Sequence, residues 1–375
     1  MADIHVARRA RAQQKVAESG ADAALITSKP NVRYLSGLVS SNAAILLPAS
    51  GPAVLATDSR YAEAAARLCP DLEVVTERQV EPALAMLAAR LGFGTLGFEA
   101  QEMTFERHTA LADLPDGPGL IMPLGHLVEG LRMIKDDTEI ELLARACAIT
   151  AEAFAAVLPT IGPDRTERDL AVLLERAMID LGADGVAFET IVASGPNGAI
   201  PHHSPGDRAF RPGDLITIDC GAQVGGYHAD MTRTVALGEP AAWQREIYDL
   251  VAAAQLAGLR AAVPGADIDA VDASARDLID GAGHADHFGH GLGHGVGLEV
   301  HEAPLMGPGR TGKLEDRVPV TVEPGIYLPG RGGVRIEDTL VVRSAATQAG
   351  TAQAATEAAG AAEVLTTTTK ELLVL

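Results

Sequence analysis

The sequence predicts an α+β protein in which a smaller N-terminal α/β domain precedes a larger domain that is richer in strands. Helical and strand patterns alternate through the first third of the 375 residues, which is typical of an α/β domain. Strand patterns dominate the remainder, and the change comes at about 125–137. A chain of this length commonly forms two domains, so we expect domains at 1–130 and 131–375.

The predicted elements of the first domain follow from hydrophobic periodicity bounded by turn residues. A polar amphipathic helix at about 3–19 precedes a short buried strand at 22–27. The segments NAAILLP and AVLAT form a strand pair joined at Ser50-Gly51-Pro52. Helices are expected at about 59–69, 80–91 and 103–113, with LEVV and TLGFE as strands between them.

Two helices open the second domain. The long pattern ELLARACAITAEAFAAVL follows two candidate N-caps, Asp137 and Thr138, because short polar side chains cap helices well. The segment TERDLAVLLERAMIDLGADG begins with Thr166 and Asp169, which resemble a capping box.

Strands and two more helices complete the second domain. DLITIDCGAQVGGYHADMTRTVAL predicts two strands that turn at Gly225-Gly226, a glycine pair that suits a hairpin. Helices at about 241–262 and 267–280 precede the Gly-rich HFGHGLGHGVGLEVHE and the strands VPVTVEPGIYL and GGVRIEDTLVV. The Ala-rich stretch 344–362 has little to bury and is expected to be a flexible loop before the last segment, EVLTTTTKELLVL.

The composition argues against nucleic-acid binding, membrane insertion and secretion. The net charge of −20 disfavours nucleic acid, whose phosphates such a surface repels. No consecutive apolar run is long enough to span a bilayer, and no apolar stretch follows the basic residues at the N-terminus, so we expect neither a membrane protein nor a secretory signal. Cys69, Cys147 and Cys220 lie far apart, which favours the reducing cytoplasm and a metal held by carboxylate and imidazole.

A pair of aspartates marks the first hairpin. Asp219 ends an apolar strand, and Asp230 lies eleven residues later at the matching end of the return strand. Adjacent carboxylates repel and need a shared proton or a cation. Each aspartate could instead cap a turn, and for this pair alone the two interpretations have equal weight.

The Gly-rich segment places glycine at every second position from 289 to 297. Such a strand has one bare face that another backbone or a ligand can approach closely. His290 and His294 project from the other face, and His301 follows soon after. A turn with hydrogen-bonded histidines is the structural alternative.

Two later strands each carry a carboxylate. Glu323 alternates with Val320 and Val322, and Pro324 keeps it extended. Glu337 shares a face with Arg335, which could neutralise it in a simple salt bridge.

Together, four carboxylates and one histidine at strand ends predict a metal site. Oxygen-rich ligands with one imidazole suit Mn²⁺ best, with Co²⁺ or Zn²⁺ as alternatives. Four negative charges exceed the need of one divalent ion but match two, which can hold a bridging hydroxide and polarise a carbonyl.

The motifs IDCG, YHADMTRT, GHGVGLEVHE, VEPGIY and VRIEDT resemble those of the pita-bread (M24-type) metallopeptidases, most of all Xaa-Pro dipeptidases (prolidases) and Xaa-Pro aminopeptidases. The resemblance is strong over about 130–343 and general in the N-terminal third, which is similar to the family's smaller creatinase-N-like domain. It implies a pita-bread catalytic domain at 131–375 and hydrolysis of the Xaa-Pro bond of dipeptides or peptide N-termini through a metal-bridging hydroxide.

The resemblance also implies a role for each site residue. Asp219 would hold one metal ion, Asp230 and Glu337 would bridge both, and His294 with Glu323 would complete the other site. Glu323 would also carry the proton. The remaining residues that the resemblance implies are the catalytic His202 and His301, with His203 as the alternative to His202, and the substrate-pocket residues His290, Arg335 and His203.

Four alternatives are considered. The fold also hosts creatinase, which works without metals and is disfavoured by the complete ligand set, and methionine aminopeptidases, which usually lack the N-terminal domain and are disfavoured by the roughly 130 residues before the second domain. An aminopeptidase without strict proline specificity and a non-catalytic peptide- or protein-binding module complete the alternatives, since fold alone never determines function. We expect a cytoplasmic homodimer with a small peptide substrate. Dipeptidase and aminopeptidase differ in whether the N-terminal domain closes the pocket beyond the proline.

Overall fold

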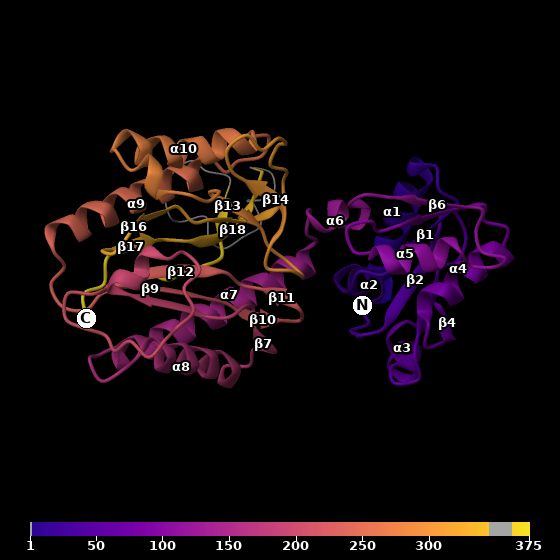
Figure 1. Cartoon of the computed structure of the whole chain (residues 1–375), viewed down its shortest axis with the longest axis horizontal. Coiled ribbons are helices and arrows are strands. Elements are labelled where there is room, and N and C mark those ends of the chain that lie inside the picture. The colour runs from indigo at the N-terminus through magenta and orange to yellow at the C-terminus, as the bar shows by residue number, and fades with distance from the viewer. Residues whose placement is uncertain (1, 345–361) are drawn as a thin grey trace. The chain divides into compact units, whose positions relative to one another are not determined.

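The computed structural model describes residues 2–344 and 362–375. The chain divides into two compact units, Met1–Arg132 and Met133–Leu375 (Figure 1). Both units combine helices with sheets, so the predicted mixed α+β class is confirmed. The predicted Ala-rich loop at 344–362 lies, apart from its two ends, outside the described residues.

A six-stranded sheet in the order β4-β3-β2-β1-β5-β6 forms the centre of the first unit. The β1–β2 and β2–β3 pairs are antiparallel, and the other three pairs are parallel. The strands are β1 (Ala23–Ile26), β2 (Ala43–Pro48), β3 (Val54–Thr57), β4 (Glu73–Thr76), β5 (Thr95–Phe98) and β6 (Leu120–Pro123). The turn predicted at Ser50-Gly51-Pro52 joins β2 to β3.

The helices of this unit are α1 (Ala2–Ser19), α2 (Lys29–Ser36), α3 (Ala62–Leu68), α4 (Val80–Arg90), α5 (Phe105–Ala112) and α6 (Leu127–Arg132). Of these elements, α2, β6 and α6 were not predicted. Pro30 stands in the first turn of α2 and Gly37 ends it with φ 77°. This arrangement is common at helix ends. In a segment of only eight residues, however, a proline and a glycine also indicate a loop, so the helix was not predicted.

Two capped helices begin the second unit. Helix α7 (Asp137–Val157) is capped by Asp136, whose carboxylate accepts from Glu139 while Glu139 reaches back. The predicted caps Asp137 and Thr138 are therefore wrong by one or two residues, because Asp136 is the residue with extended backbone before the first turn. Helix α8 (Glu167–Asp180) has the predicted capping box of Thr166 and Asp169.

Strands and the remaining helices follow. They are β7 (Gly185–Val186), β8 (Ile191–Ser194), β9 (Leu215–Cys220), β10 (Ala222–Val224), β11 (Tyr227–His228), β12 (Met231–Ala236), α9 (Ala242–Ala261), α10 (Ile268–Gly281), β13 (Gly293–Gly295), β14 (Glu302–Met306), β15 (Pro319–Val322), β16 (Gly325–Leu328), β17 (Gly332–Arg335), β18 (Asp338–Val342) and β19 (Ala362–Val364), with short 3-10 turns at Leu158–Thr160, Gly195–Ala199 and Ala285–His287. Figure 1 shows β9, β12, β16, β17 and β18 between the α9–α10 pair and the α7–α8 pair.

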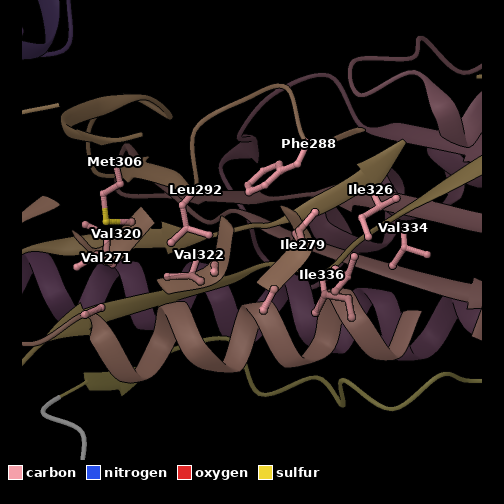
Figure 2. Close-up of a cluster of buried hydrophobic side chains, with 14 of the residues drawn as sticks. Val271, Ile279, Phe288, Leu292, Met306, Val320, Val322, Ile326, Val334 and Ile336 are labelled. Carbon is pink, nitrogen blue, oxygen red and sulfur yellow. The ribbon is translucent and has the colours of Figure 1, made fainter. Parts of the chain in front are cut away.

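The core behind the strands is aliphatic. Val320 and Val322 from β15 and Val334 and Ile336 around β17 are fully buried in one cluster, as Figure 2 shows. Thr321 and Arg335 alternate with these valines along β15 and β17, as the geometry of a strand requires. Glu323 lies directly after β15 and Glu337 directly before β18.

Among the described residues, the stretch Asp137–Thr160 is long and apolar enough by composition to cross a membrane. Ten of the residues of α7 are buried, including Leu143, Cys147 and Phe154. A core helix meets the same criteria, so this composition is weak support for a membrane span. Cys69, Cys147 and Cys220 are all free and buried.

Candidate metal centre

The first two carboxylates of the site come from the β9–β12 hairpin. Asp219 pairs with Thr232 in the antiparallel register, and Cys220 pairs with Met231. Asp230 directly precedes β12, one step beyond the last of these pairs. This register places Asp219 and Asp230 on the same face in diagonal positions. The predicted turn at Gly225-Gly226 lies between β10 and β11 and closes the hairpin.

The other three predicted ligands come from neighbouring strands of one sheet, ordered β14-β13-β15-β18-β19. His294 lies at the centre of β13, Glu323 directly follows β15, and Glu337 directly precedes β18. A backbone hydrogen bond of 3.0 Å from Glu337 N–H to the carbonyl of Thr232 connects this sheet to β12. Four of the five predicted ligands therefore lie at or beside strand ends and His294 lies within the three-residue β13, in two sheets that meet.

These side chains converge on one buried point. Ligand atoms of Asp230, His294 and Glu337 lie within 4.8 Å of one another, and all three residues are buried. His294 Nε2 lies 3.3 Å from Glu323 Oε1 and 3.6 Å from Asp230 Oδ2. His294 Nδ1 donates to the carbonyl of Gly295 at 2.9 Å, which leaves Nε2 as the nitrogen that can bind a metal ion.

Burial and repulsion act together on the carboxylates. Burial, with the nearby charges of Glu337, Asp219 and Glu323, raises the pKa of Asp230 well above its usual value. The pKa of Glu337 is raised in the same way, first by burial and then by Glu323 and Asp219. In contrast, contacts with His294 outweigh burial and hold the pKa of Glu323 well below its usual value. Buried carboxylates in such proximity call for a cation.

Asp219 shows where such a cation fits. Its Oδ1 is buried and has no hydrogen-bond partner among the described residues, although an unpaired buried oxygen is destabilising. Its Oδ2 accepts a 2.8 Å hydrogen bond from Arg335 Nη2. A divalent ion would satisfy the orphaned oxygen, so the donor set fits the metal that the sequence predicts.

The simple salt bridge considered between Arg335 and Glu337 is wrong. Arg335 pairs with Asp219, and Glu337 instead accepts from Thr232 Oγ1 at 2.6 Å. The chain leaves β17 at Arg335 and enters β18 only after Glu337, so the two side chains are not neighbours on one continuous strand.

Arg335 also links the metal centre to His290. Its Nη1 donates to Tyr327 Oη at 2.9 Å, and Tyr327 lies 2.9 Å from His290 Nε2. Because His290 Nδ1 donates to the carbonyl of Gly291 and burial lowers the pKa of His290, its Nε2 accepts from the tyrosine hydroxyl. Both His290 and Arg335 line the cavity, but the hydrogen bonds of Arg335 are already directed at protein atoms.

The two adjacent upstream histidines have different surroundings. His203 Nε2 lies 2.8 Å from Glu167 Oε2, whereas His202 is exposed to the cavity. His301 packs against the ring of His294 with centroids 4.3 Å apart. The pKa of His301 is lowered by burial and then by the charge of His294, and both His202 and His301 line the cavity.

A cavity of about 800 Å³ opens onto these residues, a size usual for small-molecule sites. Its lining includes all five predicted ligands and His202, His203, His290, His301 and Arg335. Sequence reasoning missed Tyr327, Thr232 and Glu167. Tyr327 and Thr232 stand within the quoted motifs, a signal that could have found them, but nothing local distinguishes Glu167 from an ordinary acidic residue in a helix's first turn.

Comparisons with known proteins identify the family of each domain. The profile described as metallopeptidase family M24 matches residues 141–344, and that of the creatinase/prolidase N-terminal domain matches residues 8–134. A Bacillus subtilis protein described as an uncharacterized peptidase, YqhT, is 39% identical over 324 residues, which cover 86% of this chain and 91% of the relative.

Two solved structures are similar over nearly the whole chain. An Xaa-Pro dipeptidase from Bacillus anthracis superposes with a TM-score of 0.91 at 36% identity and covers 99% of this chain and 100% of its own. An X-Pro aminopeptidase from Thermotoga maritima MSB8 superposes with a TM-score of 0.83 at 34% identity, over 95% and 98% of the two chains.

Proposed function

The chain belongs to metallopeptidase family M24, and on that premise we propose that it is a metal-dependent exopeptidase that hydrolyses the Xaa-Pro bond of dipeptides or peptide N-termini. The main observation behind this proposal is that the buried side chains of Asp230, His294 and Glu337 lie close together in the wall of the cavity. The dipeptidase and aminopeptidase named above support the same bond as target. We assign residues 1–130 to the smaller domain and 131–375 to the pita-bread catalytic domain.

Two divalent ions would be held by Asp219, Asp230, His294, Glu323 and Glu337. Burial and neighbouring carboxylates raise the pKa of Asp230 and of Glu337, so bound cations would stabilise both side chains in their ionised form. Bound there, the ions would activate a water molecule and polarise the scissile carbonyl. The oxygen-rich donors favour Mn²⁺, with Co²⁺ or Zn²⁺ as alternatives.

Protein side chains, Glu323 first among them, would transfer the proton during hydrolysis. Glu323 would be ionised at neutral pH, because bound cations and the nearby Arg335 favour the carboxylate over the neutral acid. It can therefore accept a proton from the attacking water and return it to the proline nitrogen, which must be protonated to leave as an amine. Thr321 Oγ1 donates to Glu323 at 3.2 Å and keeps the carboxylate oriented.

Three histidines face the substrate in this proposal. His202 and His301 would donate hydrogen bonds to the developing oxyanion and so stabilise it. His290, held by Tyr327, would line the pocket for the proline ring, with Arg335 and His203 behind it. A proline amide lacks an N–H, so a pocket that offers no acceptor at that position can favour it over other residues.

The experiment is a peptide panel assayed after metal removal and re-addition of Mn²⁺, Co²⁺ or Zn²⁺. Xaa-Pro, Xaa-Pro-Yaa and Xaa-Ala peptides of matched Xaa separate the alternatives. Cleavage of Xaa-Pro alone supports a dipeptidase, and cleavage of Xaa-Pro-Yaa supports an aminopeptidase. Equal rates on Xaa-Ala would remove the proline assignment, and no cleavage with any metal would leave only the binding-module alternative.

The remaining proposals concern the whole chain in the cell. Three free, buried cysteines suit a reducing cytoplasm. A homodimer is proposed as well, and light scattering of the purified protein would measure it directly.

A further inference from the structure

Glu167, the first residue of α8, binds one segment through both of its oxygens. Its side chain is fully buried, with 0% exposure. Oε1 accepts from Ser194 N–H at 2.8 Å, Ser194 Oγ at 2.7 Å and Asn197 Nδ2 at 2.9 Å. Oε2 accepts from His203 Nε2 at 2.8 Å and Gly206 N–H at 3.2 Å. Five donors from residues 194–206 therefore meet on one carboxylate.

This carboxylate remains ionised although it is buried. Burial by itself would raise the pKa of Glu167, but hydrogen bonds from Ser194, His203 and Asn197 outweigh it and hold the pKa below its usual value. Arg208 adds a second layer, because its guanidinium donates to Ser194 Oγ at 2.6 Å and pairs with Asp214. Fully satisfied buried networks of this kind make a segment rigid.

The segment that Glu167 holds carries His202. On one side of His202, the carbonyl of Pro201 accepts from Arg335 Nη1 at 3.3 Å. On the other side, the ring of His203 is bound to Glu167. His202 itself makes no hydrogen bond to any described residue and is exposed to the cavity. The chain is thus held immediately before and after His202, whose own ring makes no hydrogen bond to a described residue.

We propose that Glu167 is a positioning residue, which holds the His203 ring and the 194–206 backbone so that His202 points at the substrate. The proposal rests on the proposed function, in which His202 contacts the reacting carbonyl. It also gives His203 a definite task, as the link between Glu167 and His202. Misplacing a group in the site by about 1 Å can reduce a rate about 100-fold. Loss of the contacts made by Glu167 should therefore lower the rate measurably.

A double-mutant cycle tests this proposal in the metal-loaded, full-length protein. Glu167→Ala is expected to lower kcat about 10- to 100-fold while the content of bound metal stays unchanged. In the His202→Ala background, Glu167→Ala is expected to change kcat less than about twofold, because the group that it positions is already gone. Equal fold losses in both backgrounds would overturn the proposal, since they would show general support of the site.

Hydrogen–deuterium exchange gives a readout that does not need turnover. Glu167→Ala removes the acceptor of the Ser194 and Gly206 amides, so peptides covering 194–206 should exchange faster, whereas peptides covering Asp219 to Asp230 should not. Unchanged exchange in 194–206 would refute the anchoring itself. A wild-type protein that cleaves no Xaa-Pro peptide would instead refute the proposed function and the role of His202.

Asp169→Ala is the matched control. Asp169 belongs to the capping box of the same helix and has no hydrogen bond to residues 194–206 among those described. The control is expected to lower stability while kcat and exchange in 194–206 stay at wild-type values; a matching loss of kcat would overturn the specific role of Glu167. If Glu167→Ala does not fold, the isosteric Glu167→Gln replaces it, since its NH₂ group cannot accept and leaves either Ser194 and Asn197 or His203 and Gly206 without an acceptor.

Discussion

His202 and His203 are adjacent in the chain, yet only one of them has a free ring. His203 is bound to Glu167 and His202 is exposed to the cavity. The sequence left both as candidates for the catalytic position, because neighbouring identical residues differ only in what surrounds them. The contact that separates them joins residues 36 positions apart.

His202→Ala should therefore reduce kcat by about 100-fold or more while the metal content stays at the wild-type level, because it removes a group that acts on the transition state. His203→Ala should cost at least about tenfold less, since it only loosens the position of its neighbour. Steady-state kinetics and elemental analysis of both variants measure this. The reverse order of the two losses would make His203 the catalytic residue.

Glu167 also predicts a pH dependence of stability. Its pKa in the folded protein lies below the usual value that the unfolded chain regains. The group thus stabilises the fold above its unfolded pKa, and this contribution is lost as the pH falls through the folded value. His203 and Arg208 are the charged or titratable groups that face it.

Glu167→Gln removes this titration. The difference in free energy of unfolding between wild type and variant should be largest above about pH 5 and should shrink below about pH 4. Denaturant unfolding at several pH values measures the difference. A constant difference across this range would mean that the carboxylate does not keep its low pKa in the fold.

At the scale of elements, the alternating glycines around β13 behave as the sequence predicts. A Cβ on Gly293 would lie 2.0 Å from the carbonyl oxygen of Thr321, and a Cβ on Gly295 would lie 2.2 Å from that of Ala303. Gly291 meets the carbonyl of Met306 in the same way. Neighbouring backbones therefore pack on the bare face, and His294 is held between them.

Gly293→Ala should displace β13 and lower metal content, because a backbone carbonyl cannot move aside as a flexible side chain can. Gly289→Ala is the control, since nothing lies within 4 Å of its Cβ and its φ is not positive. Elemental analysis after dialysis against Mn²⁺ compares the two variants. Equal metal content in both would show that β13 adapts and that the close approach is not needed to place His294.

At the scale of the whole molecule, metal binding and folding should be coupled. The buried carboxylates repel each other without a cation, so chelation should lower both activity and Tm. Restoring Mn²⁺ at about 100 times its Kd should add about 2.7 kcal/mol of stability. Asp230→Ala and Glu337→Ala should abolish activity and most of this gain, because both belong to the buried cluster that would hold the metal. Calorimetry with and without Mn²⁺ tests this, and full stabilisation of either variant would exclude the two-metal arrangement.

The sequence by itself determined the mixed α+β class, the main strands and helices, and the kinds of ligand at the site. These follow from local regularities: the period of two along strands that separates Val322 from Glu323, the glycine pair that turns the Asp219–Asp230 hairpin, and the alternating glycines around His294. Short elements such as α2 were not predicted from the sequence. An initial proline and a final glycine are as typical of a turn as of an eight-residue helix.

Only the tertiary structure decided which polar groups are partners. Arg335 lies 116 residues from Asp219 and two from Glu337, yet it pairs with Asp219. Glu167 occupies an ordinary helix start until the fold brings residues 194–206 onto it. Periodicity assigns a side chain to a face, whereas a hydrogen bond needs two atoms about 3 Å apart, and that distance is set by how strands and loops far apart in the chain pack together.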